Sequence, residues 1–382
     1  MKLVYLIPAL YNAGGSERVL HNKVCWFVRR GGYDITIITT DQGNAPLFFE
    51  FPKSVHIIDL NINYSSVYSK TPLLRWFSIY RKKKLHLKRL SDILCKIQPD
   101  VTITMYPCDT VSLKKIKDGS KKILEFHNSR YLRLHQGRKG IHQIIAMYRT
   151  YQDYLFVKKF DELIVLTNEG ASQWSLPKMK VIPNAALSAP IIPKDFPNRD
   201  SKRIIAVGRL VYEKGFDRLI KAWGLLPEPI RSEWRLDIFG SGEQLSFLQT
   251  LINQPGLSSI SIKAPTKQVF EEYLNSAFLV MTSYSEGLPM VLIEAMSYGL
   301  PAICFDFPCG PKDVINDGVN GFLVKNGDIK TLSQKIQELI CNKNLLKSFS
   351  EEAKLIRNRF SEETIMEIWE KHFEELMADN KK

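Results

Sequence analysis

Two glutamates separated by seven residues stand out in the stretch 281–301, MTSYSEGLPMVLIEAMSYGLP. Glu286 lies in a polar loop, and Glu294 lies in the predicted helix 290–298, which a glycine and a proline end. The helical rise of about 1.5 Å per residue places the two carboxylates roughly 12 Å apart or less. Paired carboxylates of a glycoside hydrolase lie about 5–9.5 Å apart. The spacing therefore suits two contacts along one extended ligand better than hydrolysis.

The start of this predicted helix offers a second kind of binding group. Its first turn leaves backbone N–H groups free from about Leu288 to Val291, and such groups bind anions. Two glutamates on an isolated helix are more often solvated surface residues. The functional interpretation therefore depends on what the rest of the chain places beside them.

Three glycine-bearing turns follow predicted strands, where open α/β sheets bind their ligands. The first is Gly14-Gly15-Ser16-Glu17, and the last is Gly240-Ser241-Gly242. The middle turn holds Arg209 and Lys214, which can neutralise a diphosphate, Arg with its planar fork and Lys as a point charge. The sequence has no P-loop and no D-x-D pair for a bridging metal. We therefore expect the two basic residues to replace a metal ion, and we expect no metal cofactor.

The elements that must position these groups alternate between strand-like and helix-like segments. This rhythm is typical of parallel sheets with crossover helices. It predicts an α/β protein with two doubly wound, Rossmann-like domains that face a central cleft. The expected strands are 3–7, 34–40, 55–60, 101–105, 122–126, 163–166 and 180–182 in the first domain, and 203–207, 235–239, 260–262, 278–281 and 301–305 in the second.

The domain boundaries follow from composition. Four prolines between residues 183 and 197 exclude a regular helix or a central strand. A helical stripe of Ile365, Trp369 and Phe373 near the end predicts a helix that packs back across the first domain. The predicted parts are a first Rossmann-like domain at 1–185, a proline-rich linker at 186–200, a second Rossmann-like domain at 201–360 and a C-terminal helix at 361–382.

Composition limits the class of protein. The chain has 382 residues, of which 45% are hydrophobic, so it can bury two cores. Its six cysteines form no C-x-x-C pair, which indicates free thiols in a reducing cytoplasm. The start of the chain lacks the pattern of a signal peptide, and no window approaches 18 uninterrupted apolar residues. We therefore expect a cytoplasmic protein.

The excess of positive over negative charge is confined to the first half of the chain. Residues 1–190 hold 29 Lys and Arg against 14 Asp and Glu, whereas the remainder holds 24 against 26. The stretch 70–90 carries eight basic residues and no acid, with Trp76, Phe77 and Tyr80 among them. This pattern predicts a helix on an anionic membrane face. An ordinary crossover helix gives a similar pattern, and the two interpretations are compatible.

Taken together, the motifs resemble those of retaining glycosyltransferases with the GT-B fold, in particular family 4, the glycosyltransferases group 1. The resemblance covers essentially the whole chain and is most specific between residues 207 and 324. The segment 307–311, FPCGP, is similar to bacterial members that build surface polysaccharides. The motifs, in order, are Gly14-Gly15-Ser16-Glu17, His127-Asn128, Pro183-Asn184, Gly208-Arg209-Leu210, Lys214-Gly215, Glu286-Gly287-Leu288-Pro289, Glu294-Ala295, Asp317-Gly318 and Asn320-Gly321.

The resemblance implies that the first domain, 1–185, binds the acceptor and that the second domain, 201–360, binds the nucleotide-sugar donor. It also implies a role for each motif of the second domain. Arg209 and Lys214 would hold the donor diphosphate, Glu294 the ribose, and Glu286 the donor sugar. The nucleotide base would lie against the backbone of three residues, Lys263, Ala264 and Pro265. The backbone N–H groups that would meet the sugar and the phosphates are those of Gly287, Leu288, Pro289 and Met290.

In the first domain, the resemblance implies two contacts with the donor. The loop at Gly15 would close over the β-phosphate, and His127 would touch the transferred sugar through its main chain or its ring. Asn128 stands where the family often has Asp or Gly, which leaves its role open. Residues alone also allow His127 to be a packed core histidine.

The chemistry of transfer agrees with this assignment. Breaking a sugar–phosphate bond builds negative charge on the leaving phosphate, which Arg209, Lys214 and a helix N-terminus would stabilise. It also builds positive charge on the sugar ring, which a carboxylate and polar backbone groups can stabilise. Retention without an obvious nucleophile implies attack on the face that the phosphate leaves. Whether Glu286 takes part in the chemistry or only orients the sugar stays open.

These observations predict a retaining, metal-independent glycosyltransferase on the inner face of the plasma membrane. It would transfer a hexose or N-acetylhexosamine from a nucleotide-sugar, which we expect to be UDP-linked. The acceptor would be a lipid-linked saccharide of capsule, O-antigen or exopolysaccharide. No nucleic-acid motif is present, so no nucleic-acid partner is expected. The alternatives are a sugar-nucleotide 2-epimerase with the same fold and a non-catalytic carbohydrate-binding protein.

Overall fold

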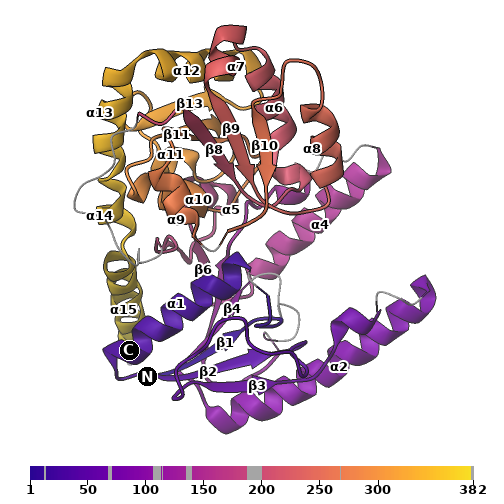
Figure 1. Ribbon diagram of the computed structural model, residues 1–382. Coiled ribbons are helices and arrows are strands. Elements are labelled where there is room, and N and C mark those ends of the chain that lie inside the picture. Colours follow the sequence, from indigo (N-terminus) through magenta and orange to yellow (C-terminus); the bar gives the residue numbers. More distant parts are fainter. Residues whose placement is uncertain are drawn as a thin grey trace.

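The structure is a computed structural model that describes residues 1–12, 14–67, 71–105, 113, 115–134, 140–186, 200–266 and 268–379. These residues form two parallel sheets of seven and six strands with helices around them. Figure 1 shows the two sheets in two domains, one above the other. The two doubly wound domains predicted from the alternating pattern are therefore present.

The N-terminal sheet has the strand order β3-β2-β1-β4-β5-β6-β7 with parallel pairing. Strands such as β4 are buried along their whole length, which explains their continuous apolar runs. The strand order changes direction between β1 and β4, where a doubly wound sheet opens its ligand crevice. The strands are β1 (Lys2–Leu6), β2 (Asp34–Thr39), β3 (His56–Asp59), β4 (Val101–Met105), β5 (Lys121–Phe126), β6 (Glu162–Val165) and β7 (Met179–Val181).

Four α-helices connect the strands of this sheet among the described residues. Helix α1 follows β1 and begins at the glycine pair, so its N-terminus lies at the carboxyl edge of the sheet. Leu90 and Leu94 of α2 are buried, while most of the earlier part of that helix is exposed. The helices are α1 (Gly15–Arg30), α2 (Pro72–Ile97), α4 (Ile141–Val157) and α5 (Asn168–Trp174), with short 3-10 turns η1 (Tyr64–Val67) and η2 (Leu132–Leu134).

The second sheet has the order β10-β9-β8-β11-β12-β13, again with parallel pairing. Strand β13 was not among the strands expected from the sequence, because the turn at Asp317-Gly318 and Asn320-Gly321 hides its start. The predicted linker 186–200 falls mostly on residues 187–199, which lie outside the described residues. The strands are β8 (Arg203–Val207), β9 (Arg235–Phe239), β10 (Ile260–Lys263), β11 (Phe278–Met281), β12 (Ala302–Asp306) and β13 (Gly321–Lys325).

The helices of the second domain surround one continuous apolar core, which reaches from β8 to α14. The short turn η3 (Tyr212–Lys214) precedes the first of them. The helices are α6 (Phe216–Gly224), α7 (Glu228–Glu233), α8 (Leu245–Ile252), α9 (Val269–Leu274), α10 (Met290–Ser297), α11 (Pro311–Val314), α12 (Ile329–Cys341), α13 (Lys343–Ala353) and α14 (Ile356–Phe360).

The last helix, α15 (Glu362–Asp379), leaves the second domain and lies beside α1 of the first, as Figure 1 shows. Ile365, Trp369 and Phe373 are buried in the same core as β1 and α1. Ion pairs such as Arg30 with Glu370 lie at the rim and are largely exposed, so they contribute little to stability. Apolar burial therefore holds α15 on the first domain. None of the described helices is long and apolar enough to span a bilayer.

Candidate active site

The loops that carry the predicted donor residues lie side by side because β8 and β11 are neighbours in the second sheet. Both strands run in the same direction, so their carboxyl ends reach the same edge. Strand β8 leads into the turn that holds Arg209 and Lys214. Strand β11 leads into the loop 282–286, and α10 starts four residues later. The fold thus brings together groups that are about 80 residues apart in the chain.

Lys214 and Glu286 form a direct ion pair across these two loops. Lys214 Nζ donates to Glu286 Oε1 at 2.5 Å, and each side chain is 16% exposed. The Ser283 hydroxyl donates to the same carboxylate oxygen at 2.7 Å. Lys214, which is predicted to bind the diphosphate, therefore contacts Glu286, which is predicted to bind the sugar. A bound diphosphate would compete with the carboxylate for this lysine.

Arg209 is exposed in the turn after β8. Its side chain makes no hydrogen bond or ion pair with any residue that the structure describes. The guanidinium group is therefore available to an anion near Lys214. Gly215 follows Lys214 with a φ of 61°, and a Cβ there would lie 2.3 Å from the Thr282 carbonyl oxygen. Only glycine allows the two loops to approach so closely.

A buried arginine that sequence reasoning missed fixes the loop of Glu286. Arg218 of α6 is 6% exposed and donates to the carbonyl oxygens of Thr282 and Ser283. Its guanidinium carbon lies 3.7 Å from the centre of the Tyr284 ring. Burial lowers the pKa of Arg218, against the influence of Tyr284. The signal in the sequence was a basic residue at a position of helix 216–225 whose neighbours on the same face are apolar, so that its side chain would face the core.

The N-terminus of α10 lies directly after the Glu286 loop. Pro289 caps the helix, and its carbonyl oxygen accepts from Leu292 and Ile293. The prediction assigned Leu288, Pro289 and Met290 to the phosphates through backbone N–H groups. Pro289 has no N–H, so it can only set the direction of the helix. Met290 and Val291 carry the first N–H groups of α10, which have no partner within the helix.

Gly287 is the point where the second domain touches the first. A Cβ on Gly287 would lie 1.8 Å from the carbonyl oxygen of His127. The chain just after β5 therefore meets the loop before α10 backbone to backbone. Its neighbour Glu286 belongs to the ion pair with Lys214, so the main chain of His127 faces the predicted sugar position.

The ring of His127 is held from the opposite side by buried groups. Its Nε2 lies 3.1 Å from Glu125 Oε2, and its Nδ1 lies 3.5 Å from the Asn184 amide nitrogen. Lys23 of α1 donates to the other oxygen of Glu125 at 2.6 Å. Both ring nitrogens thus have protein partners. The carbonyl oxygen of His127 is the part of this residue that meets Gly287 of the second domain.

Glu294 is partly buried on the inner turn of α10. Burial raises its pKa to about 7, and Arg18 of α1 opposes that shift. The influence of Arg18 means that the first turn of α1, with the predicted phosphate loop at Gly15, lies near Glu294. Arg18 is a second residue that sequence reasoning missed, although it directly follows the Gly14-Gly15-Ser16-Glu17 motif. The predicted ribose and phosphate contacts therefore converge on one region.

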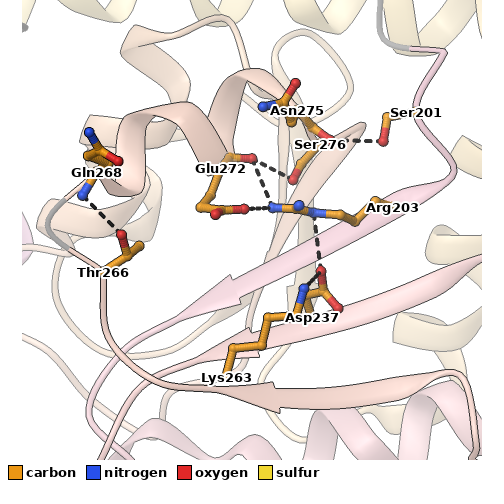
Figure 2. A network of polar contacts seen from close by, with 9 residues as sticks. All are labelled: Ser201, Arg203, Asp237, Lys263, Thr266, Gln268, Glu272, Asn275 and Ser276. Carbon is orange, nitrogen blue, oxygen red and sulfur yellow. Dashed lines mark hydrogen bonds and ion pairs between the residues drawn. The ribbon is translucent and has the colours of Figure 1, made fainter.

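The region predicted to meet the nucleotide base rests on a buried charge network, shown in Figure 2. Lys263 Nζ lies 2.8 Å from Asp237, whose other neighbour, Arg203, reaches it at 3.3 Å. Arg203 also pairs with Glu272 of α9. The carbonyl oxygen of Lys263 accepts from Gly240. Both the side chain and the carbonyl of Lys263 are engaged within the protein.

This arrangement leaves two neighbours of Lys263 open to a ligand. Ala264 and Pro265 are exposed beyond the end of β10. Because neither side chain is polar, any specific contact with a base there must come from the main chain. The charged network beneath them joins β8, β9, β10 and α9. It therefore fixes the position of this edge of the second sheet.

A second set of contacts joins the domains beside the cleft. The Cys309 N–H donates to Glu169 Oε2 at 2.9 Å, and the Gln173 amide donates to Cys309 Sγ at 3.0 Å. Asn168 donates to Asp313 from the same helix, α5. Burial and Glu169 raise the pKa of Cys309 to about 11, so this thiol stays protonated. The FPCGP segment therefore serves as a contact between the domains.

No group of three or more His, Cys, Asp or Glu in the described part of the chain has a geometry that could hold a metal ion. The positive charge that faces the predicted diphosphate position comes from Arg209 and Lys214. Gly15 opens α1 with free space around it, since a Cβ there would meet no atom within 4 Å.

Comparison with known proteins shows the family of this chain. Residues 189–356 match the family model described as glycosyl transferases group 1. An uncharacterized glycosyltransferase of Haemophilus influenzae is 30% identical over 374 residues, which cover 96% of this chain and 98% of that protein. The chain belongs to the glycosyltransferase group 1 family. It is therefore a glycosyltransferase with the GT-B fold.

Other relatives have narrower names. The amylovoran biosynthesis glycosyltransferase AmsD of Erwinia amylovora is 27% identical, with 96% of this chain and 98% of that protein covered. The lipopolysaccharide 1,6-galactosyltransferase of Salmonella typhimurium is 28% identical, with 86% and 87% covered. The structure of HepE from Anabaena in complex with UDP superimposes with a TM-score of 0.71 at 15% identity, covering 98% of this chain and all of that one, 100%. This last likeness shows the fold alone.

Proposed function

We propose that this group 1 glycosyltransferase is a retaining enzyme. It transfers a hexose or N-acetylhexosamine from a UDP-sugar to a lipid-linked saccharide, without a metal cofactor. It works on the anionic inner face of the plasma membrane, in the assembly of capsule, O-antigen or exopolysaccharide. The observation that carries the proposal is the Lys214–Glu286 pair at the N-terminus of α10, opposite the main chain of His127.

The ion pair suggests how the donor enters. The diphosphate takes Lys214 from Glu286 and binds Arg209, whose side chain is exposed beside it. Glu286 keeps its hydrogen bond from Ser283 at Oε1, and its carboxylate accepts from the hydroxyl groups of the sugar. The first N–H groups of α10 add to the positive potential at the phosphates. Binding of the donor thus rearranges charges that already lie in place.

The same groups support transfer. Negative charge grows on the leaving diphosphate, and Lys214, Arg209 and α10 stabilise it. Positive charge grows on the sugar ring, close to the His127 carbonyl oxygen and the Glu286 carboxylate. The acceptor hydroxyl attacks on the face that the phosphate leaves, and a phosphate oxygen takes its proton. This route gives retention and requires no protein nucleophile.

The first domain offers surfaces that suit a lipid-linked acceptor. Helix α2 exposes Trp76, Phe77 and Tyr80 together with basic residues, and Figure 1 shows α2 and α4 extending toward the same side of the molecule. An exposed apolar face with neighbouring basic residues binds anionic bilayers. The exposed apolar residues of α4 are Ile141, Ile144, Ile145, Met147, Tyr148, Tyr151 and Leu155.

The names of the relatives support the substrate classes. One relative is named for amylovoran biosynthesis and another as a lipopolysaccharide galactosyltransferase, and both products are bacterial surface polysaccharides. The structural neighbour from Anabaena binds UDP. Ala264 and Pro265 offer only main-chain contacts at the base position. The identity of the nucleotide base is therefore tested directly.

The test is a calorimetric screen of the purified protein against a panel of nucleotide-sugars, followed by transfer to a lipid-linked saccharide. We expect binding of a UDP-sugar and a product whose anomeric configuration, read by NMR, matches that of the donor. Arg209→Ala and Glu286→Ala should lose transfer while they keep the circular dichroism of the native protein. Full activity in both variants would contradict the site. A new sugar-nucleotide formed without any acceptor would indicate an epimerase instead.

A further inference from the structure

A chain of buried charged groups runs behind the predicted sugar position. Lys23 of α1 donates to Glu125 Oε1 at 2.6 Å, and Glu125 Oε2 lies 3.1 Å from His127 Nε2. The side chains of Lys23 and Glu125 are 5% and 2% exposed. The face of the Trp369 ring, from the C-terminal helix α15, lies 3.8 Å from Lys23 Nζ. These groups join three distant segments of the chain to the edge of the cleft.

The charges within this chain are defined by their surroundings. Burial acting alone would raise the pKa of Glu125, but Lys23 and His127 outweigh it and lower the pKa to about 2. Glu125 is therefore a carboxylate at neutral pH. Burial lowers the pKa of Lys23, while Glu125 acts against that shift. The Trp369 ring also favours the charged ammonium. Lys23 and Glu125 thus form an ion pair with no net charge.

Tyr5 of β1 is another titratable neighbour of Glu125. Burial and the nearby carboxylate raise the pKa of its hydroxyl well above the ordinary value, so it stays neutral. On the side of α15, Glu362 lines the same small cavity as Lys23 and Asn184.

This ion pair determines the form of the histidine ring. Glu125 accepts the Nε2–H of His127, and the Asn184 amide nitrogen faces Nδ1 at 3.5 Å. An amide NH₂ group meets a ring nitrogen favourably only when that nitrogen carries a lone pair. Because Lys23 already balances the carboxylate, Glu125 needs no second positive charge from the ring. The neutral Nε2–H tautomer satisfies every partner.

We propose that Lys23 and Glu125 are positioning residues for sugar transfer, which act by holding His127 neutral and fixed so that its main chain faces Gly287 and the donor sugar. The proposal rests on the proposed function of this cleft. It goes further, because it assigns a role to a buried pair outside the donor site. It also makes the C-terminal helix part of the support of the active site, through Trp369.

The physical reason lies in the charge that develops during transfer. Without Lys23, the buried Glu125 carboxylate would keep only His127 as a partner, and the ring would take a proton to balance it. A cationic ring would meet the Asn184 amide donor to donor. It would also stand close to the positive charge that grows on the sugar ring. The second effect disfavours the transition state more than the bound donor, because the positive charge on the sugar grows only as the bond breaks.

The experiment compares Lys23→Met with the double variant Lys23→Met/Glu125→Gln in the full-length protein. For Lys23→Met we expect kcat to fall at least tenfold, donor KM to change less than about threefold, and kcat to recover as the pH rises. The double variant removes both charges and leaves the glutamine carbonyl to accept from His127. It should regain kcat to within about threefold of the native protein.

A matched control is Lys122→Met. Lys122 lies on the same strand, β5, and forms a similarly buried ion pair with Asp118, but it has no contact with His127. We expect kcat to change less than twofold in the folded fraction of this variant. A loss in Lys122→Met equal to that in Lys23→Met would overturn the proposal, as would a double variant no more active than the single one.

A second measurement separates this proposal from the proposed function. The NMR signals of ¹⁵N-labelled histidine report the tautomer of His127 without any need for activity, and the His127→Gln variant assigns them. We expect the neutral Nε2–H form in the native protein at pH 7 and an imidazolium in Lys23→Met. A ring that is already cationic in the native protein would overturn the proposal. If these NMR results hold but no nucleotide-sugar is turned over, the proposed function fails and the positioning of the ring stands.

Discussion

The predicted donor site of the second domain and helices α2 and α4 of the first domain differ in how their charged and apolar side chains are arranged. In the second domain, three charged groups around the site have fixed partners: Lys214 pairs with Glu286, Arg218 donates to two carbonyl oxygens, and Lys263 pairs with Asp237. In the first domain, α2 and α4 expose basic and large apolar side chains, among them Trp76 at 68% and Ile141 at 69% exposure. The donor site depends on specific contacts between individual residues, whereas the surface of α2 and α4 depends on its overall composition.

This difference matches two kinds of binding. A small ligand with localised charge requires groups that are already held in place, since small displacements cost much of the effect on the rate. An extended, fluid surface such as a bilayer requires only that enough apolar area and positive charge face it. Single substitutions should therefore have large effects in the second domain and small, additive effects on α2 and α4.

Lys214→Ala should give the largest effect. Removing a charged group that stabilises the leaving phosphate typically costs about 100- to 1,000-fold in rate. We expect a loss of this size in kcat/KM for transfer. The control is Lys221→Ala, since Lys221 of α6 is an exposed lysine with an ordinary ion pair to Asp217. Similar kinetics in the two variants would refute a special role for Lys214.

Reversing three charges on α2, with Arg81→Glu, Lys83→Glu and Lys84→Glu together, should weaken binding to anionic vesicles. Each basic residue near such a surface contributes about 1 kcal/mol, so the triple variant should bind on the order of 100-fold more weakly or worse. Co-sedimentation with vesicles at several salt concentrations measures this. The same triple variant should keep its affinity for the nucleotide-sugar.

The control for this variant reverses exposed lysines of the second domain, Lys221, Lys330 and Lys347. These changes should leave vesicle binding within about twofold. A companion variant, Ile144→Ser with Tyr148→Ser on α4, should weaken binding at high salt as well, because apolar contacts are not screened. If the α2 and control variants sediment alike, the first domain has no special affinity for the membrane.

Gly287→Ala should disturb the contact between the domains. Its Cβ would lie 1.8 Å from the His127 carbonyl oxygen, so the two backbones could not approach as they do now. We expect kcat/KM to fall about tenfold or more, in line with the cost of small misplacements. Affinity for UDP should change little, since Arg209 and Lys214, the side chains predicted to bind the diphosphate, lie within the second domain.

Gly224→Ala is the matched control, because a Cβ there meets only Leu257 at an ordinary distance of 3.4 Å. Equal activities of the two alanine variants would show that the contact at Gly287 does not matter for transfer.

Glu294→Gln should have the smallest effect, and its sign depends on pH. The pKa of Glu294 is raised from 4.5 to about 7, so the folded protein binds more protons than the unfolded chain between these values. The associated stability is fully present below pH 4.5 and is lost as the pH rises through 7. The glutamine variant avoids this loss. Its Tm should exceed that of the native protein by a few degrees at about pH 8 and match it at about pH 4, below the unfolded pKa.

Thermal unfolding at the two pH values measures this difference. The same variant should bind the nucleotide-sugar more weakly at pH 8, because it loses the carboxylate that is predicted to bind the ribose. An equal Tm difference at both pH values would contradict the raised pKa.

Much of the fold could be predicted from the sequence, because parallel strands buried on both faces give continuous apolar runs with glycine-bearing turns between them. Strand β11 and helix α10 lie within one or two residues of their expected limits. Strand β13 was missed because the turns around Asn320 hide it. Helix α4 was missed because its apolar residues are exposed and so do not give the pattern of a half-buried helix.

By itself, the sequence predicted which residues form the proposed donor site. Arg209, Lys214, Glu286 and Glu294 follow from residue types placed after strands, since the ends of parallel strands share one edge of a sheet. It could not determine contacts that depend on how distant segments pack. Only the tertiary structure decided that Lys214 touches Glu286, that Arg218 is buried beneath their loop, and that Lys23 reaches Glu125 behind His127. These contacts join residues 60 or more positions apart in the sequence. The electrostatic interactions between them are strong only because the residues are buried.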